Sequence, residues 1–440
     1  MGHFVPHTDA ELAEMLAFIG LSSLDELFET IPGALRLSEG LAVAPGLSEP
    51  DVMAEMTRLA DANRSGRDLL CFAGGGAYDH EVPAATRRLA FRSEFVTAYT
   101  PYQPEVAQGV LQALFEYQTL VSRLAGVEVA NASLYDGASA TVEAINLAVA
   151  ATGRERVWLS HGVNPTWREV VHTFAAGTGH DIVDVPLHDG LTAWPGGGEA
   201  GAVVVQYPNY LGGIESLVEA RAAADRAGAL LVVAFDPVAA GLLHSPGHLG
   251  ADVVVGEGQP FGTPMSLGGP YLGLFACRLQ HVRRLPGRLV GETVDVDGRR
   301  AYVTTLRTRE QDIRREKASS NVCTNQTLIA VCCAIQMSWL GTSGVRELAL
   351  RCARGTRYTR DALLGIDGVE AHSGAPTLRE FAVRTPVPAT TLVERMADEG
   401  FLAGVPLTDD YGDGLLVAVT ERRTRAEIDA YVDAMGKVLR

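Results

Sequence analysis

Residues 251–274 read ADVVVGEGQPFGTPMSLGGPYLGL, and the fold of the chain can be worked out from this stretch. Its β-branched run, Val253–Val255, predicts a buried strand. The run ends in a segment rich in glycine and proline, which interrupts regular structure, and an apolar run resumes at Tyr271. The stretch contains no lysine. We predict two buried strands joined by a loop that offers no amino group.

Between residues 127 and 277, short β-branched runs alternate with helical segments such as 138–151 and 214–227. The predicted strands are 127–133, 156–160, 181–185, 202–206, 230–235, 252–255 and 271–275. Continuous apolar strands that alternate with helices indicate a parallel sheet covered on both faces. The sequence therefore predicts a doubly wound α/β domain, in which ligands bind at the carboxyl ends of the strands.

Three of the predicted strands end in residues that suit ligand binding. The first is followed by four small or polar residues that open a helix: Asp136, Gly137, Ala138 and Ser139. Backbone amides at such a helix start form an anion site. Asp236 follows the strand 230–235, where a carboxylate can meet the protonated ring nitrogen of a cofactor. The third strand end is the segment 256–258.

Two glycine-rich segments resemble nucleotide-binding motifs but lack their essential residues. The segment 74–76 is not followed by Lys-Ser/Thr, so a tight turn with close packing is favoured over a phosphate-binding loop. The segment 256–258 starts like a dinucleotide fingerprint, but Phe261 stands at the third glycine position. Pro260 also blocks a regular helix there. Neither segment predicts a nucleotide site.

A loop rich in aromatic and amide groups precedes the predicted helix 106–124. It contains Tyr99 and Tyr102 together with two prolines, so it cannot be the interior of a helix. Ordered loops before a rigid helix often carry binding residues. A helix-capping loop with packed tyrosines is an equal alternative.

Composition excludes several classes of protein. The chain has 440 residues and a net charge of −16, which argues against a nucleic-acid partner because binding phosphates needs a basic face. No run approaches the roughly 18 apolar residues of a transmembrane helix, and the N-terminus lacks a signal core. We therefore expect a cytoplasmic protein that does not enter a membrane.

No metal site is predicted from the histidines and cysteines. His244 and His248 have helical metal spacing, but the Pro-Gly between them prevents the helix. The six cysteines follow neither a disulfide framework nor a zinc pattern, which indicates buried, reduced thiols.

The length allows two domains with an additional arm. Residues 1–65 are predicted to be a helical arm without a core of its own, 66–335 a large α/β domain, and 336–440 a small α+β domain. Three helix starts in the arm are marked by capping residues: Thr8 with Glu11, Ser23 with Glu26, and Ser48 with Asp51. Two further helices, 322–340 and 345–364, are predicted around the boundary of the last two domains.

Six long segments together resemble one family, the glycine cleavage system P protein, and specifically its subunit 1, the N-terminal half of decarboxylating glycine dehydrogenase. They are GAYDHEVP (76–83), RSEFVTAYTPYQPEVAQG (92–109), VANASLYDGASA (129–140), VVVQYPNYLGGIE (203–215), GEGQPFGTPMSLGGPYLG (256–273) and TREQDIRREKASSNVCTNQTL (308–328). The resemblance runs nearly end to end.

This resemblance implies the aspartate-aminotransferase fold, which is fold type I of enzymes that use pyridoxal phosphate (PLP). It implies a hetero-oligomer of two plus two chains, in which subunit 2 binds PLP. In that complex glycine loses CO2 and its aminomethyl group passes to the lipoyl arm of H protein. A paralogue that serves another amino-acid pathway and a non-catalytic scaffold are the alternatives.

The sequence departs from the catalytic half of the family at its most important residue. Aligning Phe261 and the Thr-Pro that follows it puts Gln259 at the position of the Schiff-base lysine, and an amide cannot form an imine. The whole chain has only two lysines, Lys317 and Lys437, and neither has the expected spacing from Asp236. We expect no catalytic residue in this chain, no covalently bound cofactor and no activity without its partner.

The resemblance also implies where the chain meets its partner. In fold-type-I dimers a residue just before the small domain touches the neighbour's PLP phosphate, and Ser319, Ser320 and Asn321 occupy that place. The alternative is that these residues cap the helix 322–340. The remaining site residues form a predicted vestigial pocket: Tyr99, Tyr102, Asp136, Gly137, Ala138, Ser139, Asp236 and Gln259.

Overall fold

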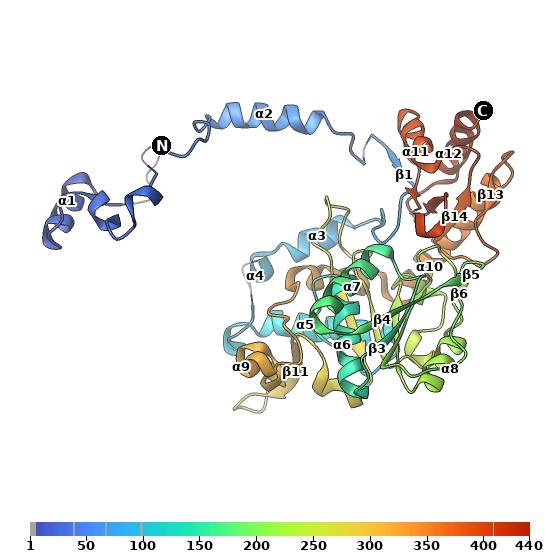
Figure 1. Cartoon of the computed structure of the whole chain (residues 1–440), viewed down its shortest axis with the longest axis horizontal. Coiled ribbons are helices and arrows are strands. Elements are labelled where there is room, and N and C mark those ends of the chain that lie inside the picture. Colours follow the sequence, from blue (N-terminus) through green and yellow to red (C-terminus); the bar gives the residue numbers. More distant parts are fainter. Residues whose placement is uncertain (1–5, 38–39, 67, 97–99, 408) are drawn as a thin grey trace. The chain divides into compact units, whose positions relative to one another are not determined.

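A computed structural model describes the chain except for residues 1–5, 38–39, 67, 97–99 and 408. It divides into two compact units, Met1–Arg64 and Ser65–Arg440. Figure 1 colours the chain from its N-terminus in blue to its C-terminus in red. Each unit is described by itself.

The first unit holds two α-helices, α1 (Asp9–Phe18) and α2 (Glu49–Asp61), with 3-10 turns at Leu24–Phe28 and Gly33–Leu35. The capping box at Thr8 and the Ser48 cap are both confirmed. Ser23 starts the turn at Leu24–Phe28 as predicted, but its side chain caps no amide: it donates to Glu26 Oε1 at 3.3 Å, and the same carboxylate accepts from the Ser22 N–H. Leu16 is the only buried residue in the described part of this unit.

The second unit is built on a seven-stranded sheet in the order β2-β10-β9-β8-β7-β3-β4. Its strands are β2 (Val129–Ala130), β3 (Arg156–Ser160), β4 (Asp181–Val185), β7 (Ala202–Tyr207), β8 (Leu230–Phe235), β9 (Val253–Glu257) and β10 (Gly273–Cys277). All seven predicted strands are present, although β2 is much shorter than predicted. Its extension fails because the backbone N–H of Ala132 bonds to Arg288 outside the sheet, and Ser133 has a φ of +104°.

The prediction of a wholly parallel sheet is wrong at one strand. β10 runs antiparallel to both of its neighbours, β9 and β2, while the strands from β9 to β4 are mutually parallel. The physical reason is the connection: the loop 258–272 contains no helix, and a parallel return needs a crossover of about a dozen or more residues that is usually helical.

Helices cover both faces of this sheet, as predicted. The helices are α5 (Gln108–Ala125), α6 (Gly137–Thr152), α7 (Pro165–Thr178) and α8 (Leu217–Ala227). Alternate residues of one strand enter opposite cores, since side chains of a strand point to alternate faces. In β7, Val203 and Val205 pack with α5 and α8, whereas Val204 packs with α6.

The element α10 (Thr327–Leu363) consists of two helical segments, which confirms the two helices predicted at 322–340 and 345–364, although the first starts at Thr327 and not at 322. Gly341, with a φ of +60°, breaks it near the predicted gap. By length and composition α10 is apolar enough to cross a membrane, which corrects the expectation that no such segment exists. Buried residues such as Ala330 and Cys333 pack α10 into the core with α5, and this is how a core helix behaves.

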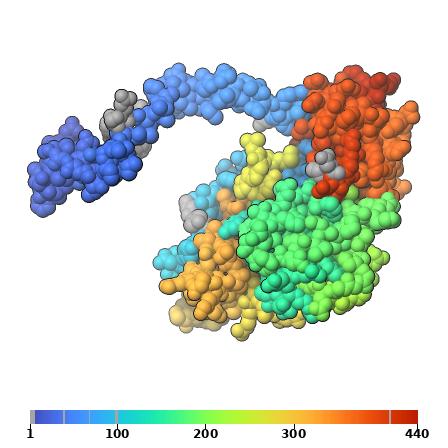
Figure 2. All heavy atoms as spheres, in the orientation of Figure 1, coloured from blue at the N-terminus to red at the C-terminus, as the bar shows by residue number. Residues whose placement is uncertain are grey.

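A smaller antiparallel sheet, β13 (Glu370–Ala371), β14 (Glu380–Arg384), β17 (Leu415–Ala418) and β16 (Val405–Pro406), forms a C-terminal lobe with α11 (Ala389–Asp398) and α12 (Arg425–Val438). Figure 2 shows this lobe in orange and red. β1 (Leu70–Cys71) pairs with β15 (Phe401–Leu402) in the same lobe. The structure leaves Ser65–Arg440 undivided, so the predicted boundary at 335/336 stays a prediction.

The remaining elements are short. They are α3 (Ala84–Ala90), α4 (Ser93–Val96), α9 (Gln311–Arg314), the hairpin β5 (Leu187–His188) with β6 (Leu191–Thr192), and the hairpin β11 (Leu289–Val294) with β12 (Arg300–Thr305).

Candidate functional site

Four side chains, three of them buried and Asp236 half-buried, form a clasp between the carboxyl end of β8 and the C-terminal lobe. We define this clasp as Asp236, Arg379, Glu380 and Tyr78. Arg379 Nη2 lies 2.7 Å from Asp236 Oδ2, and its guanidinium carbon lies 3.5 Å from the centre of the Tyr78 ring. The Tyr78 hydroxyl donates to Glu380 Oε2 at 2.9 Å. The clasp therefore joins the large sheet to β14 through the loop that carries Tyr78.

The loop 74–76 packs closely against this clasp. The backbone N–H of Gly75 donates to Glu380 Oε1 at 2.7 Å. A Cβ atom at Gly74 would collide with the Glu380 carboxylate and with Ala418. The prediction of a tight turn with close packing is confirmed. Burial raises the pKa of Glu380 to about 7, against the hydrogen bonds and the Arg379 charge that lower it.

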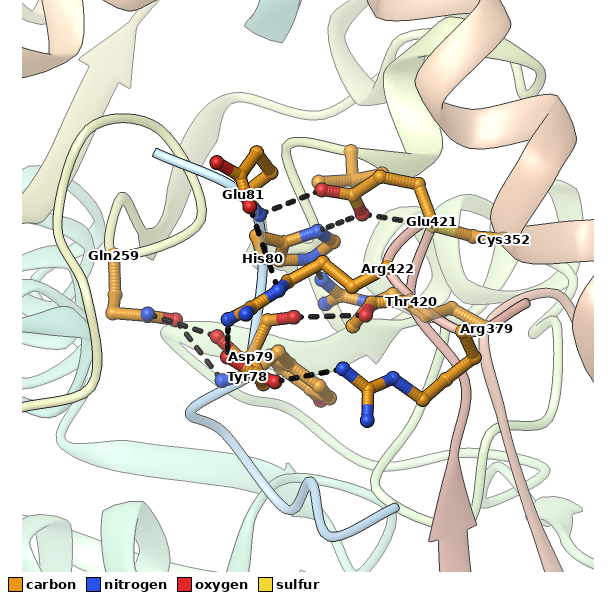
Figure 3. Close-up of polar contacts among 12 residues, drawn as sticks. Tyr78, Asp79, His80, Glu81, Gln259, Cys352, Arg379, Thr420, Glu421 and Arg422 are labelled. Carbon is orange, nitrogen blue, oxygen red and sulfur yellow. Dashed lines mark hydrogen bonds and ion pairs between the residues drawn. The ribbon is translucent and has the colours of Figure 1, made fainter. Parts of the chain in front are cut away.

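His80 extends the clasp to Glu421, which precedes α12, and Figure 3 shows His80 beside the Glu421 side chain. Its Nε2 lies 2.6 Å from Arg379 Nη1, and its Nδ1 lies 2.6 Å from Glu421 Oε2. Arginine can only donate, so Nε2 must accept and Nδ1 carries the proton that it donates to Glu421. His80 thereby links the Arg379 guanidinium to the Glu421 carboxylate.

The His80, Cys352 and Glu421 side chains lie close enough together to form a metal-ligand triad. Two features oppose that use. The Arg379 guanidinium bonds the free nitrogen of His80, and burial raises the pKa of the Cys352 thiol. A cation beside the ligands and a protonated thiol both disfavour a metal ion.

Gln259 lies fully buried beside Tyr78 and uses its side-chain amide completely. Its Oε1 accepts from the backbone N–H of Tyr78 at 3.0 Å, and its Nε2 donates to the carbonyls of Tyr78 at 3.0 Å and Thr263 at 2.9 Å. The residue predicted at the lysine position is thus a bridge that fixes the 78–81 segment (Figure 3).

The predicted helix start at Asp136 is confirmed, since its side chain accepts from the Ser139 N–H at 2.7 Å. The first helical amide, that of Gly137, donates to Glu257 Oε2 at 3.0 Å. Glu257 Oε1 also accepts from the amides of Gln259 at 3.0 Å and Leu272 at 2.8 Å. Burial raises the pKa of Glu257 to about 8, opposed by these three N–H donors.

The two tyrosines of the predicted pocket have different outcomes. Tyr99 lies outside the described residues. Tyr102 is 54% exposed and does not line the cavity at Asp236; its hydroxyl accepts from Arg288 Nη2 at 3.2 Å. Arg288 also donates to the carbonyl of Cys323 at 3.1 Å, so Tyr102 stands beside the segment before α10.

The segment 319–326 is fastened to the strand-end region by its own contacts. The Glu143 carboxylate of α6 accepts a hydrogen bond from the Ser320 side chain, and Asn325 donates to the Ala132 carbonyl at 2.8 Å. Because α10 starts only at Thr327, with Gln326 as its N-cap, the alternative that residues 319–321 cap a helix at 322 is wrong. Ser319 and Asn321 are exposed, which leaves both side chains open to solvent.

Sequence reasoning did not single out Glu257, Arg379, His80 or Glu421. Arg379 stands in an ordinary strand pattern and meets Asp236 across more than a hundred residues of sequence, so no local signal identified it. In the sequence Glu257 is one residue of a glycine segment. Its place after a predicted strand was the available signal.

The mixed sheet, the C-terminal lobe and the site between them define the PLP-dependent transferase class of fold type I. An alanine–glyoxylate aminotransferase from Nostoc sp. superposes with a TM-score of 0.59 at 15% identity, covering 85% of this chain and 96% of that one. At that identity only the fold is shown, and the predicted fold class is confirmed.

The chain belongs to the glycine cleavage system P-protein family, whose sequence model matches residues 2–435. It is 46% identical to the probable glycine dehydrogenase (decarboxylating) subunit 1 of Chlorobium limicola, over 98% of this chain and 99% of that protein. The corresponding protein of Desulforamulus reducens is 44% identical over 99% of each chain. A crystal structure of an inhibitor-bound glycine decarboxylase (P-protein) matches with a TM-score of 0.93 and 44% identity, covering both chains fully.

We predict that Asp236→Asn destabilises the protein by about 3 kcal/mol or more, because it leaves the Arg379 charge buried without its anion. Thermal unfolding measures the effect. Asp297→Asn, which removes an exposed ion pair with Arg299, is the control and should change little. The double variant Asp236→Asn with Arg379→Met should recover part of the loss. A single variant as stable as the wild type would contradict the clasp.

We predict that Glu143→Gln raises stability at pH 8 but not at pH 5. Burial raises the pKa of Glu143 to about 7 from its ordinary value of 4.5. The folded state therefore holds a proton that the unfolded chain releases, and wild-type stability falls as pH rises from about 4.5 through 7, by up to about 3 kcal/mol. Unfolding temperatures at both pH values test this, with the exposed Glu292→Gln as control. An equal effect at pH 5 and pH 8 would contradict it.

Proposed function

We propose that this chain is the PLP-free subunit of glycine dehydrogenase (decarboxylating) and works only with a lysine-bearing subunit 2. The observation that carries the proposal is Gln259: the residue at the lysine position is a buried amide with every hydrogen bond made inside the chain. Of the two lysines, Lys317 is exposed and Lys437 pairs with Glu399 on the lobe at 2.6 Å.

The names of the relatives support the reaction. They favour glycine decarboxylation over a paralogue in another pathway or a scaffold that kept only the fold. Bound in subunit 2, PLP would supply the electron sink for loss of CO2 from glycine, and the aminomethyl group would pass to the lipoyl group of H protein. We further propose a cytoplasmic hetero-oligomer of two plus two chains that binds neither nucleic acid nor membrane.

The contribution of this chain to the partner's site comes from the segment before α10. Ser319 and Asn321 are exposed, while Ser320 is held inward by Glu143. Glu143 thereby holds the segment between the two exposed side chains. Hydroxyl and amide donors on a fixed segment suit the oxygens of a phosphate. We propose that Ser319 and Asn321 reach the PLP phosphate of the partner, with Ser320 as their anchor.

Co-expression with subunit 2 tests the assignment. We expect exchange of the glycine carboxyl group with bicarbonate only when both subunits, PLP and H protein are present, because neither the lysine of subunit 2 nor the segment before α10 of this chain is sufficient alone. Full exchange by subunit 2 without this chain would contradict the proposal, as would exchange by this chain without subunit 2.

Replacing Ser319 and Asn321 together by alanine should weaken PLP binding by the mixed complex about a hundredfold or more, since each hydrogen bond to a charged group is worth about 1.5–3 kcal/mol and about 1.4 kcal/mol is a factor of ten. PLP titration of the assembled complex measures this. Thr293→Ala, an exposed hydroxyl on β11, is the matched control. Adding Ser320→Ala should weaken binding further by loosening the segment. Unchanged PLP affinity of the triple variant would sink the proposal.

A further inference from the structure

A PLP site needs three things from the protein: an amino group, an anion site for the phosphate, and a carboxylate for the ring nitrogen. The strand ends of this chain keep the second and third in recognisable form. Both positions are already occupied by side chains of this chain. A carboxylate occupies the anion site, and a guanidinium occupies the position of the ring nitrogen.

The anion place is filled by Glu257. Its carboxylate accepts the first amide of α6, from Gly137, at 3.0 Å, and two more amides from Gln259 and Leu272. A phosphate brought to the same helix start would meet the Glu257 oxygens instead of free N–H groups. Trp167 closes the approach, since its ring would collide with a Cβ at Gly137.

The ring-nitrogen place is filled by Arg379. Asp236 Oδ2 pairs with its guanidinium at 2.7 Å, and Arg379 is 4% exposed. A protonated ring nitrogen at Asp236 would be a second cation beside a buried one. The Tyr78 ring packs over the same guanidinium, with the ring centre 3.5 Å from the guanidinium carbon.

The space that remains is small. The cavity bounded by Asp236, Glu257, Trp167 and Arg379 measures about 40 Å³. A neighbouring one beside Glu380 measures about 30 Å³. A water molecule occupies about 30 Å³ of liquid, whereas cofactor-sized ligands need about 300 Å³ or more. The residues present therefore do not fit PLP.

We propose that Glu257 and Arg379, and not the missing lysine alone, keep PLP out of this chain and are the residues that confine the cofactor to the partner subunit. The exclusion of PLP is a property of this chain alone, whereas the role of the partner subunit rests on the proposed function. It follows that restoring the lysine does not restore the site, because the phosphate and ring positions stay filled.

The test compares purified full-length variants for PLP retained per chain after gel filtration. Gln259→Lys should retain no more PLP than the wild type. Gln259→Lys with Glu257→Ala and Arg379→Ala should retain PLP clearly above that level. Stoichiometric PLP on Gln259→Lys would overturn the proposal, and so would a folded triple variant that retains none.

A milder variant keeps the test decisive if the triple variant fails to fold. Glu257→Ala alone should bind inorganic phosphate about tenfold more tightly than the wild type by calorimetry, because removing the carboxylate frees the α6 amides. Glu215→Ala is the matched control: it deletes another buried carboxylate that accepts a backbone N–H, from Thr192, away from this site. No gain by a folded Glu257→Ala, or an equal gain by Glu215→Ala, would overturn the proposal.

Both measurements use this chain alone and no glycine. A failed exchange assay with subunit 2 would therefore remove the proposed function and leave the exclusion standing. PLP on Gln259→Lys would remove the exclusion and leave the subunit role standing.

Discussion

The ion pair between Asp236 and Arg379 is the interaction on which the second unit depends. It joins the end of β8 to the residue directly before β14; the Arg379 side chain is 5% exposed and the Asp236 side chain 13%. A buried charge is tolerated only when it is paired and its remaining hydrogen bonds are made. Tyr78, His80 and Glu380 meet that condition around Arg379, so the loop 74–81 and the lobe are held as one arrangement.

This arrangement leaves little open space at the strand ends of the large sheet. In a sheet of this kind the strand ends are the expected ligand site, but here they are closed by the clasp, by Gln259 and by Glu257. The exposed polar groups lie instead on the segment before α10, at Ser319 and Asn321. The strand-end region still contributes, because Glu143 and Ala132 hold that segment in place. The strand-end region thus supports the segment before α10.

Much of the fold followed from the sequence because its signals are local. Strands β3, β4 and β8 match the predicted bounds fully, since their β-branched runs are bounded by glycine and polar residues. The antiparallel direction of β10 could not be predicted, because hydrophobic periodicity indicates that a strand exists but not its direction relative to its neighbours. The Ser23 cap failed for a similar reason: two adjacent serines compete for one carboxylate, and geometry alone decides between them.

The site was predictable only in part. Gln259 and Asp236 could be identified because each follows a strand signal at a position that the family resemblance aligns. Their partners could not: Tyr78 and Arg379 come from segments far away in sequence, and pairing at that range is set by tertiary packing. Ser319 to Asn321 were located correctly as a segment, but their relation to the helix was not, since Gln326 carries no distinctive capping signal.

The three filled positions are physically linked, and this explains why all of them are filled. A cofactor site emptied by loss of its lysine alone would leave the buried first amide of α6 without an acceptor and the half-buried Asp236 without a cation. Unpaired buried groups of this kind cost about 1–3 kcal/mol each, and more when charged. Glu257 satisfies the amides and Arg379 neutralises the carboxylate. A chain of this fold that holds no PLP therefore needs side chains that replace the phosphate and the ring of the cofactor. Its stability depends on these side chains, in the way that the stability of a cofactor-binding chain depends on the bound cofactor.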